Sequence, residues 1–114
     1  MRVAVEGCCH GELDRIYAAV AQTEATTGAK VDVLVVCGDF QGLRNVADVA
    51  TMAVPDKHKR LGGFHEYYSG AKTAPLLTLF VGGNHEAAAY LWELHHGGWV
   101  AKNMYFVGWA GVVR

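Results

Sequence analysis

Short apolar runs alternate along the chain with segments that carry one apolar face. The runs at residues 2–7, 31–37 and 76–81 consist mainly of valine, leucine and other apolar residues, which is typical of strands in a parallel sheet. The second run is rich in valine, and we expect it to be covered on both faces. Apolar residues between the first two runs recur at helical spacing: Leu13, Ile16, Tyr17, Val20 and Ala21. Gly28 is a stop signal for the helix that this spacing predicts.

Weaker patterns complete the predicted order of elements. They predict helices over residues 43–52 and 87–94, a polar loop over 54–63, and short strands over 104–107 and 110–113. The aromatic segment 64–70 has no decisive pattern. Strands that alternate with helices indicate parallel pairing with right-handed crossovers. The sequence therefore predicts an α/β fold with a mostly parallel sheet and flanking helices, and residues 1–114 show no internal domain boundary.

Polar side chains collect where the three predicted long strands end. Cys8 and His10 follow the first strand, Asp39 the second, and Asn84 and His85 the third. Ligands of such sheets bind beyond the carboxyl ends of the strands. Thiolate, imidazole, carboxylate and carboxamide groups all bind metal ions, so a shared metal site is expected. Each residue alone has a structural alternative, such as a buried thiol, a turn aspartate or a helix-capping asparagine.

The residue types suggest how such a site would work. A carboxylate has two oxygens, so Asp39 can bridge two ions, and a pair of ions about 4 Å apart can clamp a transferring phosphoryl group. His85 is a candidate general acid for the leaving oxygen because imidazole titrates near neutrality. If the chain stays extended as far as His10, Cys8 and His10 project to the same side and Cys9 to the other. Cys8 is then the ligand candidate and Cys9 a core residue.

Composition narrows the possible classes of protein. The chain has 114 residues, 52% of them hydrophobic, and a formal net charge of −1, so charge alone gives no indication of nucleic-acid binding. Its three cysteines form no paired pattern, which fits a reducing compartment, and no apolar stretch approaches the roughly 20 residues of a membrane span. The basic residues Arg44, Lys57, Lys59 and Arg60 are interpreted as solvated, with phosphate contact as the alternative.

Several motifs indicate a family. GD at residues 38–39 and GNHE at 83–86 resemble the calcineurin-like metallophosphoesterases. With CCHGELD, CGDFQ, YYSG, GGNHEA and GGWVA, the resemblance becomes one to the RNA lariat debranching enzymes, over essentially the whole chain. It implies the amino-terminal half of an α/β/β/α sandwich. It also implies hydrolysis, in the nucleus, of the 2′–5′ phosphodiester at the branch point of excised intron lariats, with branched RNA as the partner and no membrane.

The same resemblance implies roles for individual residues. Cys8, His10, Asp39 and Asn84 fall on metal-binding positions with Asp39 as the bridging ligand, and His85 falls on the general acid that contacts phosphate. Most phosphoesterases have aspartate where Cys8 stands, and a thiolate favours zinc or iron over magnesium. One or two Fe2+, Zn2+ or Mn2+ ions are therefore expected.

Two other functions stay open. The family's second half supplies further metal-binding histidines, so we expect these 114 residues alone to be weak or inactive. A half-sandwich would also expose a strand edge and an apolar sheet face, as suits a non-catalytic binding or assembly module that joins a protein partner or a second copy. The short motifs further allow a metallophosphatase with another phosphoester substrate.

Overall fold

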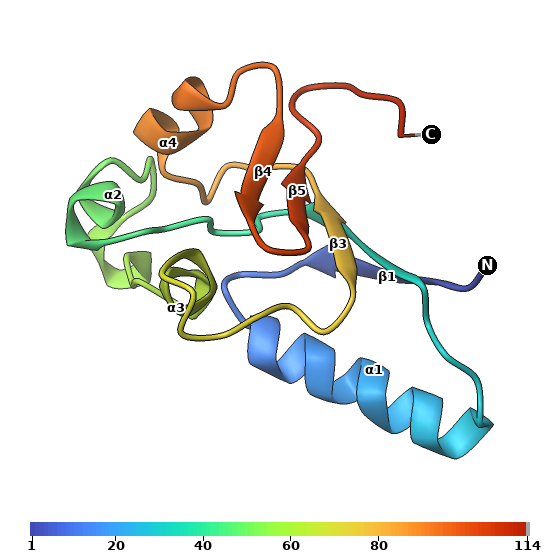
Figure 1. Ribbon diagram of the computed structural model, residues 1–114. Coiled ribbons are helices and arrows are strands. Elements are labelled where there is room, and N and C mark those ends of the chain that lie inside the picture. The colour runs from blue at the N-terminus through green and yellow to red at the C-terminus, as the bar shows by residue number, and fades with distance from the viewer. Residues whose placement is uncertain (114) are drawn as a thin grey trace.

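A single sheet forms the centre of the protein. The computed structural model describes residues 1–113, and within them the sheet has the order β1-β2-β3-β5-β4 (Figure 1). Its strands are β1 (Val3–Cys8), β2 (Val33–Gly38), β3 (Leu77–Phe80), β4 (Gly98–Ala101) and β5 (Met104–Phe106). All neighbours pair in parallel except β4, which runs antiparallel to β5. The predicted α/β fold with a mostly parallel sheet is confirmed.

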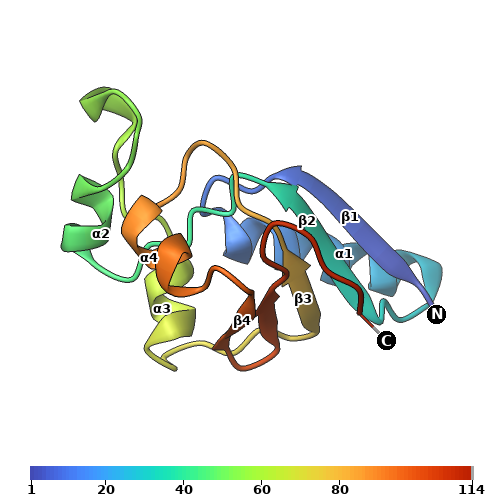
Figure 2. The ribbon, with the colours of Figure 1, turned by 90° about the horizontal axis from the view of Figure 1, so that it is seen from above.

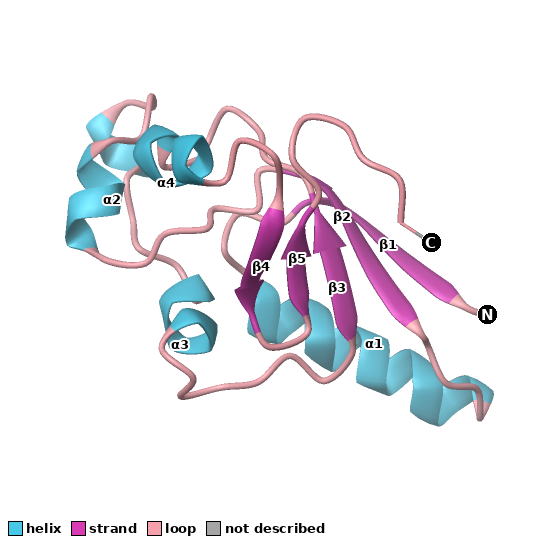
Figure 3. Cartoon of the chain, turned by 45° about the horizontal axis from the view of Figure 1, so that its top comes forward, coloured by secondary structure: helices cyan, strands magenta, loops and turns pink. Residues whose placement is uncertain are grey.

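Helices flank this sheet. They are α1 (Leu13–Thr27), α2 (Val46–Ala50), α3 (Phe64–Tyr68) and α4 (Ala88–Glu93), with a short 3-10 helix at Asp56–His58. The longest, α1, ends at Gly28 as predicted, where a left-handed φ of 67° lets the Gly28 N–H donate to the Glu24 carbonyl. Figure 3 shows α1 running along the strands, whereas the three shorter helices gather beside the β4 edge. Within residues 1–113 no helix has the length and apolar character needed to cross a bilayer.

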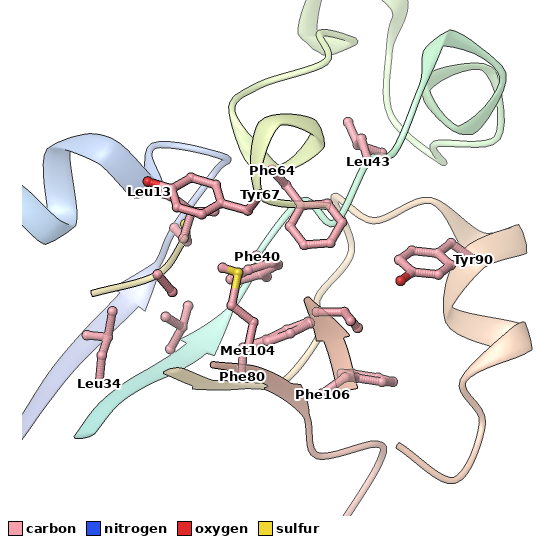
Figure 4. Packing of buried hydrophobic residues seen from close by; sticks show 14 of the residues in the cluster. Leu13, Leu34, Phe40, Leu43, Phe64, Tyr67, Phe80, Tyr90, Met104 and Phe106 are labelled. Carbon is pink, nitrogen blue, oxygen red and sulfur yellow. The ribbon is translucent and has the colours of Figure 1, made fainter. Parts of the chain in front are cut away.

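One face of the sheet carries the hydrophobic core. Side chains in matching register there are buried: Leu34, Val36, Thr78, Phe80, Met104 and Phe106. Phe40, just beyond β2, stacks on Phe80 with ring centroids 3.7 Å apart and meets the edge of Phe64 from α3 at 5.5 Å (Figure 4). A buried hydrogen bond of 2.8 Å between the hydroxyls of Tyr17 and Thr78 ties α1 to β3. These contacts hold α1 and α3 against the core face of the sheet.

The opposite face of the sheet is open. In β2, Val33 and Val35 are only half-buried, although their neighbours Leu34 and Val36 are buried, so the expectation that this strand is covered on both faces is wrong. On β1, Val3 is 47% and Val5 69% exposed. The reason is that the core helices pack against one side only, with α1 behind the sheet when it is seen from above (Figure 2). This open face, defined by Val3, Val5, Val33, Val35, Leu77, Leu79 and Tyr105, is mainly apolar.

The end of the chain departs from the predicted pattern. Residues 110–113 form no strand; instead, β4 and β5 make a hairpin. Its turn at Lys102 and Asn103 uses a left-handed φ of 63° at Asn103, a conformation that asparagine tolerates better than most residues. Gly98, which follows the helical segment predicted over residues 87–94, begins β4.

Candidate metal centre

The predicted ligands of β1 and β2 come together at the carboxyl edge of the sheet. Backbone pairing continues past the strands, with the Cys9 N–H donating to the Gly38 carbonyl (3.2 Å) and the His10 N–H to the Asp39 carbonyl (2.7 Å). As a result, the Cys8 sulfur, a His10 ring nitrogen and an Asp39 oxygen all lie within 4.8 Å of one another. One soft sulfur, one imidazole and one carboxylate form a donor set that suits a divalent transition metal ion.

Asp39 is the best buried of these groups, with 7% of its surface exposed. Its Oδ1 accepts a hydrogen bond from the His85 backbone N–H at 3.0 Å, and its Oδ2 lies 3.9 Å from His10 Nε2. Gly83 makes this approach possible, because a Cβ there would collide with the Asp39 carboxylate and lie 2.6 Å from its backbone nitrogen. The loop after β3 is therefore closed around the carboxylate.

The backbone is strained where the two strands end. His10, Asp39 and Gln41 have left-handed φ values of 49°, 39° and 58°. Residues other than glycine rarely adopt this conformation. Such strain costs on the order of 1–3 kcal/mol per residue and concentrates at functional sites. The chain is thus not extended as far as His10, so the premise that assigned the two cysteines was wrong.

The structure nevertheless separates the cysteines as predicted. Cys8 is exposed at the end of β1, whereas Cys9 is 3% exposed and packs in the core. Burial raises the pKa of the Cys9 thiol to about 11, which keeps it neutral and unsuited to bind a metal ion. Cys8 remains the thiol that faces the cluster with His10 and Asp39.

Asn84 and His85 lie in the loop that encloses Asp39. Asn84 is exposed, and its two neighbours Gly83 and His85 both contact Asp39. The alternative of Asn84 as a helix cap is wrong, because the residue that precedes α4 is Ala87. The His85 ring lies 5.0 Å from the His10 ring, edge to face. All five predicted site residues therefore come from segments that meet at this edge, and their roles stay predictions.

Glu86 is a component that the sequence did not reveal. It is 5% exposed, and its carboxylate accepts the backbone N–H groups of Gln41 (2.8 Å) and Gly42 (2.9 Å). Burial raises the pKa of Glu86 to about 7, against the opposing effect of these two hydrogen bonds. Glu86 thus fixes the loop that follows Asp39.

Arg44 has a structural role rather than a role toward phosphate. Its guanidinium donates to both oxygens of Asp48, at 2.7 and 2.9 Å, and to Glu93 at 2.9 and 3.1 Å. It also lies 4.0 Å from the centre of the Tyr90 ring. These contacts join α2 to α4, so the guanidinium is neither solvated on its own nor free for a substrate.

Comparisons with known proteins identify related sequences. The sequence model of the calcineurin-like phosphoesterase family matches residues 1–113. The chain is 59% identical to the lariat debranching enzyme of Homo sapiens and 58% to that of Danio rerio, in both cases over 114 residues. It is 51% identical to the lariat debranching enzyme of Arabidopsis thaliana. These alignments cover 100% of this chain but only 21%, 20% and 27% of the three relatives, so the chain spans about a quarter of their length or less.

The contact between Gly83 and Asp39 gives a test of the site that does not depend on activity. We expect Gly83→Ala to displace the Asp39 carboxylate and to weaken zinc binding by about tenfold or more, the range seen when supporting residues of metal sites are changed. Gly7→Ala is the matched control, since a Cβ at Gly7 meets nothing within 4 Å. Titration with a competing chelator measures both affinities. Equal zinc affinities for Gly83→Ala and the unchanged chain would contradict this account of the site.

Proposed function

The chain belongs to the calcineurin-like phosphoesterase family, and we propose that it carries metal-binding residues of an enzyme that debranches RNA lariats. The reaction would be metal-dependent hydrolysis of the 2′–5′ phosphodiester at the branch point of excised introns. The convergence of Cys8, His10 and Asp39 within 4.8 Å carries the proposal. Identity of 51–59% to lariat debranching enzymes, over the whole chain, supports branched RNA as the substrate.

Divalent ions fit the donor groups at this edge of the sheet. Cys8, His10 and Asn84 would each contribute one ligand atom, and Asp39 would bridge two ions through its two oxygens. When bound, such ions stabilise the negative charge that develops on the phosphate oxygens. The Cys8 thiolate favours zinc or iron over magnesium, and Fe2+, Zn2+ or Mn2+ are the proposed ions.

His85 is proposed as the general acid. Its backbone N–H is held by Asp39, which fixes the residue while the imidazole stays half-buried beside the His10 ring. In its protonated form the imidazole would give a proton to the ribose oxygen as the bond between that oxygen and phosphorus breaks. Water would supply the new oxygen on phosphorus, so that the products are a phosphomonoester and a ribose hydroxyl.

These 114 residues alone are proposed to be weak or inactive. The cluster offers three groups close together and a fourth, Asn84, in the adjoining loop, which is fewer than two well-held ions require. Relatives named lariat debranching enzymes are roughly four to five times as long as this chain, judged from the 20–27% of their length that it covers. The nucleus is the proposed compartment, because excised introns, the proposed source of the substrate, are turned over there.

A second candidate function is supported by the open face of the sheet. Val5 is 69% exposed, and Trp99 on β4, which pairs with Tyr105 of the open face, is 65% exposed, so apolar side chains meet solvent on this side. Such a surface favours contact with another protein or a second copy of the chain. In this alternative the chain acts as a non-catalytic assembly module. A third, a metallophosphatase with a different phosphoester substrate, shares the metal site and differs only in substrate.

Metal content tests the role of Cys8. We expect Cys8→Ser to lower zinc affinity by more than about tenfold, because a hydroxyl is a far weaker zinc ligand than a thiolate. Cys37→Ser is the control, since Cys37 is also an exposed thiol and lies outside the cluster. Purified variants loaded under identical conditions can be compared by elemental analysis. Equal zinc content in the two variants would remove Cys8 from the metal site.

Turnover of branched RNA tests the proposed reaction. The full gene product, with Mn2+ or Zn2+, should cleave a 2′–5′ branched oligonucleotide and leave a linear 3′–5′ RNA intact. His85→Gln should slow the cleavage about 10²–10⁴-fold with little change in metal content, as expected for loss of a general acid.

Two results would revise this proposal in different ways. A metal-loaded protein that hydrolyses simple phosphomonoesters but not branched RNA would favour the general metallophosphatase. Robust cleavage of branched RNA by residues 1–114 alone, lost in Cys8→Ser, would overturn the expectation that this chain is weak by itself.

Molar mass in solution tests the assembly alternative. If the open face drives self-association, the chain should exceed its monomer mass of 12.3 kDa in light scattering, and Val5→Asp should return it to a monomer. Val46→Asp is the matched control, because Val46 is 76% exposed on α2, outside the open face. A chain that is monomeric at all concentrations would argue against self-association.

A further inference from the structure

A basic cavity adjoins the candidate metal centre. It has a volume of about 280 Å³ and is lined by His10, Gln41, Lys57, His58, Arg60 and His85. His10 and His85 lie at the carboxyl edge of the sheet, in the candidate metal centre. The other basic residues come from the loop between α2 and α3. Figure 2 shows this loop, in green, extending from α2 away from the sheet. The His58 ring lies 6.5 Å from that of His85, so the loop reaches the site.

The charge of this cavity is local. The whole chain has a net charge of −1, yet three of its ten lysines and arginines lie within residues 57–60. Of these, Lys59 forms an ion pair with Asp56 at 3.0 Å. Among residues 1–113, neither Lys57 nor Arg60 has a carboxylate within ion-pair distance, and no acidic residue lines the cavity. Two cations without partners, facing a cavity beside a phosphoesterase site, suit a second phosphate.

Gln41 supplies an independent indication of a ligand. The residue is 2% exposed, and its Oε1 is the one buried side-chain nitrogen or oxygen without a hydrogen-bond partner in the described part of the chain. Its strained backbone, φ 58°, is held in place by Glu86. Leaving a buried polar atom unpaired is unfavourable, and such atoms call for an explanation. Gln41 lines the cavity and its terminal torsion is soft, so rotation about that torsion can turn the carboxamide toward a bound group.

We propose that this cavity binds the nucleotide next to the scissile phosphodiester. Lys57 and Arg60 would neutralise the phosphate of that nucleotide, and the Gln41 carboxamide would bond to its ribose. Inside an RNA strand the free ribose hydroxyl is the 2′-OH, so the same contact would favour RNA over DNA. These are binding and positioning residues, with no part in proton transfer. The inference rests on the proposed function in one respect, that the substrate is a nucleic acid.

Binding of a short RNA tests the two cations. The probe is a fluorescent uridine trinucleotide, and its affinity is measured by anisotropy against salt concentration. Replacing both cations, Lys57→Ala with Arg60→Ala, should reduce the negative slope of log K against log salt by about 0.7, since the two side chains share one phosphate and each neutralised phosphate of a single strand contributes about 0.7. Lys59→Ala removes one charge from the same loop and should leave the slope unchanged, because Lys59 is already paired with Asp56.

Two outcomes would overturn the role of the cations. One is an unchanged slope in the double variant. The other is a slope that falls with Lys59→Ala as much as it does in the double variant, which would show a general effect of charge rather than a site. Inorganic phosphate as a competitor separates capture of a phosphate group alone from capture of the strand. If it displaces the trinucleotide with equal affinity per phosphate, the ribose contact is absent.

Gln41→Met tests the ribose contact and includes its own folding control. It removes the unpaired polar atom at similar volume, so the melting temperature should hold or rise. Affinity for the RNA trinucleotide should fall to that of its DNA counterpart, while DNA affinity stays the same. Equal RNA and DNA affinities in the unchanged protein would overturn this contact. Because binding is measured without turnover, failure here leaves branched-RNA cleavage untouched, and loss of cleavage leaves these binding results interpretable.

Discussion

Parallel pairing of β1 with β2 sets Cys8 opposite Gly38, and this register determines which side chains share the site. The two strands end together, so the residues that follow them turn away from the sheet at the same edge. The backbone bonds from Cys9 and His10 to the carbonyls of Gly38 and Asp39 carry the pairing two residues further. A shift of one residue would turn every side chain of the strand to the opposite face and move Cys8 away from Asp39.

Once this register is set, the remaining parts of the site have little freedom. Gly83 lets the loop after β3 close against Asp39, and Glu86 in the same loop holds the backbone of Gln41 and Gly42. Both contacts link segments about 45 residues apart in sequence. They also hold Asp39 and Gln41, two residues with left-handed φ values, in place, which is how a folded domain can maintain local strain at a site. The geometry of the ligands is thus a property of the sheet and not of a single loop.

The features of the fold that could be predicted from the sequence are those set by residues close together in the chain. The strands of the parallel sheet, α1 and its end at Gly28 were predictable because periodicity and a glycine stop signal act over a few residues. The grouping of Cys8, His10 and Asp39 was predictable from topology alone, although the assumed extended backbone was wrong. The clamp by Glu86 and the ion pairs of Arg44 were not, since long-range contacts leave no pattern in the neighbouring residues. The hairpin of β4 and β5 was missed because Gly98 carries no apolar signal of a strand.

Because side chains alternate between the two faces of the sheet, neighbouring positions of one strand are under different constraints. Residues such as Leu34 and Val36 point into the core that supports the site, whereas Val33 and Val35, each one position away, point to the open face. Substitutions on the open face are therefore not restricted by packing in the core, whereas substitutions on the core-facing side of the same strands are. Across related proteins, the even-numbered positions of β2, which face the core, and its odd-numbered positions, which face away from it, should therefore evolve at different rates.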